Sequence, residues 1–238
     1  MAEATLIIGN KNYSSWSLRG WLAVKQAGVP FDEILVNLGD DDFKAQLKSH
    51  SKAGKVPVLI HDGLEIWDTL SIIEYLAETY PHAGLWPKDP TARAAARSVS
   101  AEMHSSFSAL RSHMPMNIRA SHPDRGRGPG VDQDIARITE IWRDRRVAMT
   151  DRRVAVTDRR AAVAESGDFL FGAWSAADAM YAPVVSRFKT YGVALDDVCQ
   201  RYADAVLGCD LFKEWETEAL KEAWIVPEDE IGAEPARA

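Results

Sequence analysis

The first third of the chain alternates short apolar runs with stretches of helical periodicity. The apolar runs 5–9, 31–38, 56–60 and 64–67 are typical of strands, and Asp62-Gly63 between the last two is a hairpin signal. The remaining apolar spacing predicts helices over 16–27, 42–47 and 69–79, with Gly28 placed to end the first. The resulting order is β-α-β-α-β-β-α, and its first β-α-β unit predicts a parallel pair of strands.

The pattern changes near residue 81. Residues 81–90 hold three prolines and one glycine, which is typical of a connector. Beyond them almost no strand pattern occurs, and helices are expected over 92–111, 175–191, 196–207 and 211–224, with a loop over 121–130. We therefore expect an α/β domain over 1–80, a linker over 81–90, an all-helical domain over 91–226 and a frayed acidic tail over 227–238.

A seven-residue unit is repeated in tandem over 144–164, as DRRVAMT, DRRVAVT and DRRAAVA. One interpretation is a tolerated duplication that lengthens a helix, because fourteen extra residues make about four turns and keep the flanking faces nearly in phase. The other is a contact surface built by the six arginines of the repeat. The unit fits a coiled coil poorly, since its apolar residues are consecutive.

Composition and charge narrow the class of protein. The chain has 238 residues, a net charge of -7 and 46% hydrophobic residues, as expected of a globular protein. We expect a cytoplasmic protein without a membrane span, because no signal peptide and no long apolar run occur. The acidic balance argues against nucleic acid as a partner. Cys199 and Cys209 form no disulfide or zinc pattern, and no metal site is expected.

Two serines, Ser14 and Ser15, stand where the first predicted helix begins. Free backbone N–H groups and the helix dipole favour an anion at such a position. Plain N-capping by serine explains the same residues without any function. A serine nucleophile is disfavoured, because no G-x-S-x-G turn occurs.

Two further positions allow both a structural and a binding interpretation. Proline within the strand-like run at Val56-Pro57 indicates either an edge strand or a cis bond that exposes the backbone of Val56 to a ligand. Asp68-Thr69 precedes another predicted helix. The hydroxyl of Thr69 and nearby N–H groups suit a carboxylate there, or they cap the helix and nothing more.

Together these motifs resemble the glutathione transferase superfamily over nearly the whole chain. SSWSLR (14–19) resembles the serine motif of zeta-class and related bacterial members, and GKVPVL (54–59) resembles the cis-proline segment. Asp68-Thr69 resembles the acid-serine pair that grips the γ-glutamyl end, although the family usually has Glu or Gln and then Ser there. FLFG (169–172) with Ser175 and Asp178 resembles the family's capping box and staple, a sound capping pair on physical grounds.

The resemblance implies an α/β thioredoxin-like N-terminal domain, an all-α C-terminal domain and glutathione as co-substrate, without a metal. It also implies an enzyme that presents the glutathione thiol as a thiolate to a small electrophile, as in detoxification. Ser14 is expected to donate a hydrogen bond to the sulfur, with Ser15 as its rival. The implied binding residues are Val56 beside Pro57 for the cysteinyl backbone, Asp68 for the ammonium, Thr69 for the γ-glutamyl carboxylate, and Lys44 and Lys55 for the glycine carboxylate.

The electrophile is expected between the two domains, where ligand clefts commonly lie. Candidate wall residues are Met103, His104, Phe107 and Arg111, with Met114 and Met116 nearby; their other interpretation is helix core plus a solvated arginine.

The resemblance also implies a homodimer. Two alternatives stay open: a glutathione-dependent cis-trans isomerase of the maleylacetoacetate type, and a non-catalytic glutathione-binding or interaction protein. A disulfide exchanger is disfavoured, because serines stand where cysteines are needed.

Overall fold

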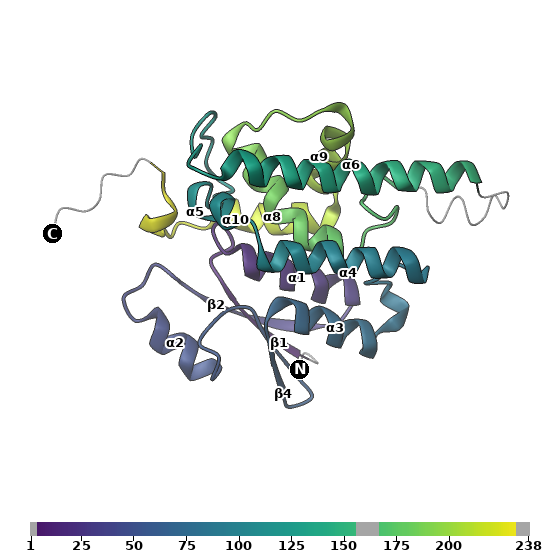
Figure 1. The fold of residues 1–238 in the computed structure, drawn as a ribbon. Coiled ribbons are helices and arrows are strands. Elements are labelled where there is room, and N and C mark those ends of the chain that lie inside the picture. The colour runs from purple at the N-terminus through teal and green to yellow at the C-terminus, as the bar shows by residue number, and fades with distance from the viewer. Residues whose placement is uncertain (1–3, 156–166, 232–238) are drawn as a thin grey trace.

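The computed structural model describes residues 4–155 and 167–231. Its first part follows the predicted order (Figure 1). The elements are β1 (Ala4–Gly9), α1 (Ser15–Ala27), β2 (Phe31–Val36), α2 (Phe43–His50), β3 (Val58–His61), β4 (Leu64–Trp67) and α3 (Thr69–Thr79). The β-α-β-α-β-β-α prediction is thereby confirmed.

The four strands form one sheet in the order β2-β1-β3-β4. β1 and β2 pair in parallel, as predicted, whereas β3 runs antiparallel to both β1 and β4. Side chains alternate across the sheet: Leu6 and Ile8 join the large core under α1 and α3, and Ile7 joins a smaller cluster with Leu47 of α2. The sheet is thus covered on both faces.

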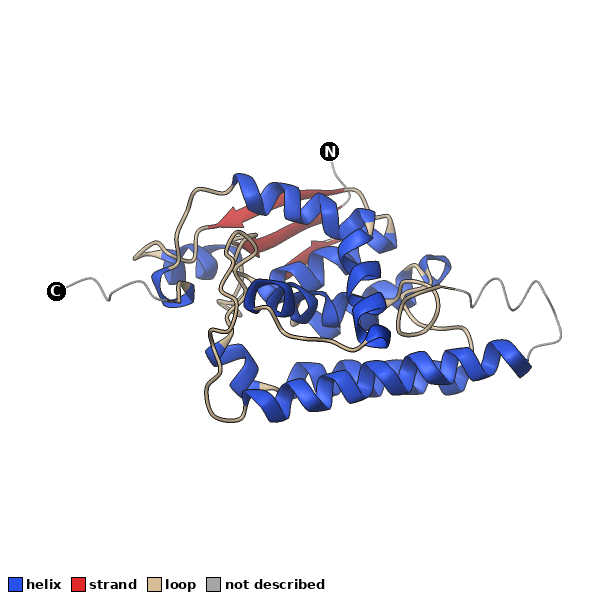
Figure 2. Cartoon of the chain, turned by 90° about the horizontal axis from the view of Figure 1, so that it is seen from above, coloured by secondary structure: helices blue, strands red, loops and turns tan. Residues whose placement is uncertain are grey.

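The helical part follows a short turn, η1 (Pro81–Ala83), and lies above the sheet in Figure 1. Its elements are α4 (Pro90–Ser105), α5 (Ser108–His113), α6 (Val131–Ala155), α8 (Ala176–Tyr191), α9 (Asp197–Gly208), α10 (Asp210–Lys221) and a final turn, η2 (Pro227–Asp229). The long α6 runs beside α4, to which Arg137 and Glu102 join it by an ion pair of 2.7 Å (Figures 1 and 2).

The helix predicted over 92–111 is wrong as a single element, because it breaks at Phe107. Phe107 has a φ of 61° and buries its ring in the core. The break also lets Arg111 fold back, so that its Nη2 donates to the carbonyls of Met103 and His104 in the last turn of α4. Those carbonyls have no partner within their own helix, and the guanidinium satisfies them.

The first copy of the repeat and the second as far as Ala155 lie on α6, as expected if the duplication lengthens a helix. The rest of the repeat lies outside the described residues. The capping pair before α8 is confirmed. The Asp178 carboxylate accepts from the Ser175 N–H (2.9 Å) and hydroxyl (2.8 Å), and burial raises the pKa of Asp178 to about 6.

The start of the expected acidic tail packs against the body of the protein. Residues 227–231 are described, and 232–238 are not. The Glu230 carboxylate accepts hydrogen bonds from Tyr13 (2.5 Å) and Asn117 (3.0 Å). This turn therefore covers the segment that leads into α1.

Candidate active site

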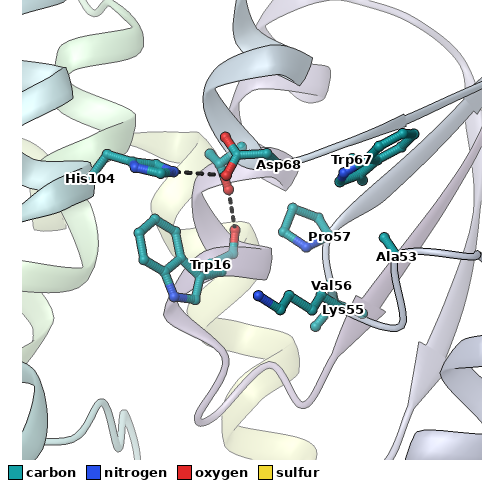
Figure 3. A pocket seen from close by; sticks show the side chains of 9 residues that line it. Trp16, Ala53, Lys55, Val56, Pro57, Trp67, Asp68 and His104 are labelled. Carbon is teal, nitrogen blue, oxygen red and sulfur yellow. Dashed lines mark hydrogen bonds and ion pairs between the residues drawn. The ribbon is translucent and has the colours of Figure 1, made fainter.

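A cleft of about 430 Å³ lies where the two parts of the chain meet (Figure 3). Four segments contribute: the start of α1, the loop before β3, the junction of β4 with α3, and the end of α4. The lining residues are Trp16, Ala53, Lys55, Val56, Pro57, Trp67, Asp68, Thr69 and His104. Six of the residues singled out from the sequence as binding or wall residues therefore share one cavity: Lys55, Val56, Pro57, Asp68, Thr69 and His104.

The first turn of α1 lies at one side of this cleft. Ser14 is its N-cap, and its Oγ accepts from the Ser17 N–H at 3.3 Å. The Ser14 hydroxyl also forms a 2.8 Å bond with Ser17 Oγ, which in turn accepts from the Gly9 N–H at 2.9 Å. Ser14 and Ser15 are each 8% exposed, and Trp16, rather than either serine, lines the cleft.

Three arginines cluster behind this turn: Arg19, Arg111 and Arg187. Arg187 of α8 donates to Ser15 Oγ at 3.3 Å, and Arg19 donates to the Ser15 carbonyl at 3.2 Å. Within the described residues no carboxylate forms an ion pair with either guanidinium. Burial, and then repulsion from Arg111, lowers the pKa of Arg187 to about 10, so this side chain stays charged at neutral pH. The cluster therefore makes the surroundings of Ser15 positive.

The indole of Trp16 is held between charged and aromatic groups. The guanidinium carbons of Arg19 and Arg111 lie 4.6 Å and 4.8 Å from its ring centroid. The His104 ring meets it edge-on at 5.1 Å. Cations are attracted to the faces of indole rings, so these contacts fix the ring as one wall of the cleft.

The loop before β3 forms the opposite wall. The Val56-Pro57 peptide is cis, which answers the question that the sequence left open. The strand ladder begins at Val58, so the backbone N–H and C=O of Val56 lie outside it. Gly20 of α1 touches this loop, since a Cβ there would lie only 2.7 Å from Pro57 Cγ.

Asp68 and Thr69 stand at the N-terminus of α3. Asp68 is the N-cap, with a φ of 71°, and its Oδ1 accepts from the Leu70 N–H at 2.9 Å. Its Oδ2 meets His104 Nε2 at 2.8 Å, a bond drawn in Figure 3. The Thr69 hydroxyl donates to the Trp16 carbonyl at 3.4 Å. This end of the cleft therefore has a carboxylate, a hydroxyl and the start of a helix.

The remaining candidates lie elsewhere. Lys44 is exposed on α2 and does not line the cleft. Met103, Phe107, Met114 and Met116 are core residues, and Arg111 does not line the cleft but contacts two of its lining residues, Trp16 and His104. Among the described residues, no group of three or more potential metal ligands occurs, and no helix is long and apolar enough to cross a bilayer.

Sequence reasoning missed several residues of the site. Trp16 and Ser17 stand inside the quoted serine motif, but the pattern does not tell which of its side chains face the cleft. Trp67 is the last residue of β4, and nothing in the sequence around it indicates that it lines a cleft. The pairing of His104 with Asp68 spans 36 positions and depends on how the two parts pack.

Comparison with known proteins supports a family assignment for the first part of the chain. Residues 13–79 match the family described as glutathione S-transferase, N-terminal domain. A probable maleylacetoacetate isomerase from Caenorhabditis elegans is 44% identical over 86 residues, covering 36% of this chain and 39% of that protein. A probable glutathione S-transferase from Nicotiana tabacum is 40% identical over 85 residues, covering 36% and 38%. The chain thus matches about two fifths of the length of these relatives.

Solved structures extend the likeness to the whole fold. A glutathione transferase homolog from Burkholderia with bound glutathione covers 93% of this chain and 100% of its own, with a TM-score of 0.62 and 21% identity. A theta-class transferase from Xanthomonas axonopodis pv. citri, also with glutathione bound, covers 92% and 100%, with a TM-score of 0.60 and 18% identity. The architecture is therefore a thioredoxin-like domain followed by an all-helical domain. Residues 13–79 thus match the N-terminal domain of the glutathione S-transferases, and the whole chain has the fold of the solved glutathione transferases.

Proposed function

We propose that the chain is a glutathione transferase that holds the glutathione thiol as a thiolate and presents it to a small electrophile. One observation carries the proposal: Lys55, Val56, Asp68 and Thr69, from separate segments, line one cleft beside the N-terminus of α1. Their chemistry suits an acidic tripeptide. A lysine and a helix N-terminus suit carboxylates, free backbone groups suit a peptide, and an aspartate suits an ammonium.

A free thiol ionises near pH ~8.5, so little thiolate forms at neutral pH without help. In this chain the help comes from a serine hydroxyl, from the N–H groups that begin α1, and from the positive arginine cluster. We assign the hydroxyl to Ser14, with Ser15 as its rival. The serine donates a hydrogen bond and does not attack the electrophile itself.

The test is ultraviolet titration of the thiolate of bound glutathione. Ser14→Ala is expected to raise the pKa of the bound thiol by about one unit or more and to leave binding largely intact, because one hydrogen bond to a charged group is lost. An unchanged thiol pKa in both Ser14→Ala and Ser15→Ala contradicts the assignment. Turnover of a chloro-nitroaromatic with glutathione separates an enzyme from a non-catalytic binding protein.

Thr69→Ala tests the other end of the ligand. It is expected to weaken glutathione binding, because it removes a hydroxyl that contacts the bound ground state. Calorimetry gives the dissociation constant. Unaltered affinity in Thr69→Ala contradicts the placement of the γ-glutamyl carboxylate at this helix.

A second candidate is a glutathione-dependent cis-trans isomerase of the maleylacetoacetate type. The C. elegans relative is named as such an enzyme, and a rat maleylacetoacetate isomerase is 37% identical over 89 residues. The cations around Trp16 favour a substrate that carries carboxylates. Turnover of a cis-enedione diacid, with no conjugate accumulating, supports the isomerase over the transferase.

We also propose a homodimer, in which the sheet domain of one subunit lies against the helical domain of its partner. Leu64 and Trp67 support it, because both are more than half exposed on the edge strand β4. Light scattering measures the mass, and a monomer contradicts this proposal.

A further inference from the structure

Ser17 lies directly behind Ser14 and is completely buried. Its Oγ accepts from the Gly9 N–H at 2.9 Å, at the end of β1. Its second contact is the 2.8 Å bond with Ser14 Oγ. Ser17 does not line the cleft, so any influence on a ligand there passes through Ser14.

In the pair formed by Ser14 and Ser17, one of the two hydroxyl protons has no acceptor within the part of the chain that the structure describes. A hydroxyl has one proton to donate and two lone pairs that accept. When Ser14 donates to Ser17, the proton of Ser17 is left without an acceptor among the described residues. When the bond runs the other way, Ser17 donates to Ser14, and the proton of Ser14 becomes free. Because a hydroxyl rotates about its C–O bond, the same 2.8 Å separation serves both directions.

We propose that Ser17 is a positioning residue that turns the Ser14 hydroxyl toward the sulfur of bound glutathione. The proposal rests on the proposed function, since it needs a thiolate beside Ser14. The hydrogen bonds then run from the Gly9 N–H to Ser17, from the Ser17 hydroxyl to Ser14, and from the Ser14 hydroxyl to the thiolate. No proton is transferred, and no covalent bond forms or breaks.

The arrangement acts in two ways. Ser14 Oγ already accepts from the N–H of Ser17. In the proposed direction it accepts from the hydroxyl of Ser17 as well, so its own proton is left to point outward. A hydroxyl that accepts hydrogen bonds is also a stronger donor, because bonds in a chain polarise one another. Ser17 thereby stabilises the thiolate without touching it.

The experiment is a double-mutant cycle read by the pKa of the bound thiol. Ser17→Ala is expected to raise that pKa by about half a unit in the wild-type background, and to leave the dissociation constant of glutathione unchanged when it is measured below the pKa of the bound thiol. In the Ser14→Ala background the same substitution is expected to have no further effect, because the hydroxyl on which it acts is gone. Ser17→Cys keeps a weak donor in a similar volume, serves if the alanine variant does not fold, and is expected to give a smaller rise. Ser100→Ala removes a buried serine of α4 and is the matched control, with no shift expected.

The outcomes separate the two proposals. If glutathione binds with an acidic thiol, but Ser17→Ala gives no shift or the same shift with and without Ser14, the positioning role is overturned and the proposed function stands. If the wild-type protein does not bind glutathione, or leaves its thiol at the free pKa, the proposed function fails and the positioning role fails with it.

Discussion

The imidazole Nε2 of His104 lies 2.8 Å from Asp68 Oδ2 and joins the helical part of the chain to the sheet part across the cleft. The other oxygen of the same carboxylate caps α3 through the Leu70 N–H. Both oxygens are thus held, one from each side, and the orientation of the carboxylate is fixed before a ligand arrives. We expect this preorganisation to contribute to glutathione affinity.

His104→Leu is expected to weaken glutathione binding by roughly threefold to tenfold, the equivalent of one hydrogen bond. Asp68→Asn is expected to weaken it further, because the charge that we propose to face the ammonium is lost while the cap remains. Calorimetry measures both. Asp89→Asn is the matched control, since Asp89 caps α4 through the Ala92 N–H and does not line the cleft. Equal affinity in His104→Leu and the wild type contradicts the orienting role.

Gly20→Ala tests the contact between α1 and the Pro57 loop. Alanine favours a helix over glycine by about 1 kcal/mol, but its Cβ would lie 2.7 Å from a rigid ring atom. Such overpacking costs about 1–3 kcal/mol. We expect a lower free energy of unfolding together with weaker glutathione binding, because the loop that carries Val56 must move.

The matched control for that variant is Gly208→Ala at the end of α9, where a Cβ meets nothing within 4 Å. This control is expected to be neutral or stabilising in urea unfolding. If Gly20→Ala behaves in the same way as Gly208→Ala, the contact with Pro57 does not limit residue 20.

Asp178→Ala is expected to lower the free energy of unfolding by about 2–4 kcal/mol. The carboxylate accepts from the N–H groups of Leu170 and Ser175 inside the protein, and both lose their partner in the variant. Urea unfolding at constant pH measures the loss. Asp196→Ala removes an exposed N-cap of α9 for comparison, and it is expected to cost less. If Asp178→Ala and Asp196→Ala lower the free energy of unfolding equally, Asp178 stabilises the protein only as a helix cap.

Asp229→Asn tests a dependence of stability on pH. Burial raises the pKa of Asp229 to about 6, and Arg187 lowers it in part. The folded state therefore favours the protonated form of Asp229. Its contribution to the free energy of unfolding is fully present below the unfolded-state pKa of about 3.9 and is lost as the pH rises through the folded-state pKa of about 6. No side-chain hydrogen bond of Asp229 occurs among the described residues, so asparagine replaces it cleanly.

The variant is accordingly expected to gain stability relative to the wild type between pH 4 and pH 7, by about 1–2 kcal/mol after allowing for partial exposure. Urea unfolding at both pH values measures the difference. A constant difference contradicts the buried acid as its source.

Local signals account for the part of the fold that the sequence predicted. Ser14 and Gly28 mark the ends of α1, and Asp62-Gly63 marks the hairpin, because capping and turn chemistry depend on neighbouring residues. The break at Phe107 has no such marker. It depends on where the ring finds its core and on carbonyls that Arg111 reaches only after the chain turns.

The same division applies to the site. Thr69 and Val56 could be singled out because each stands at a recognisable local feature, a helix start and an X-Pro step. The bond of His104 to Asp68, and the bond of Arg187 to Ser15 over 172 positions, arise from packing between the two parts. No pattern within one segment specifies such pairs.

Trp21 of α1 lies against Trp215 of α10, with ring centroids 5.4 Å apart, and the buried Arg19 donates to the Met180 carbonyl of α8 at 2.8 Å. The linker therefore joins two parts of different topology that share one hydrophobic core. A chimaera that joined the sheet half of this chain to the helical half of a relative would bring together core side chains that do not match in shape, and we expect it to be less stable than this chain. A substitution on one side of that core changes the packing on the other side, so the two halves have to be redesigned together.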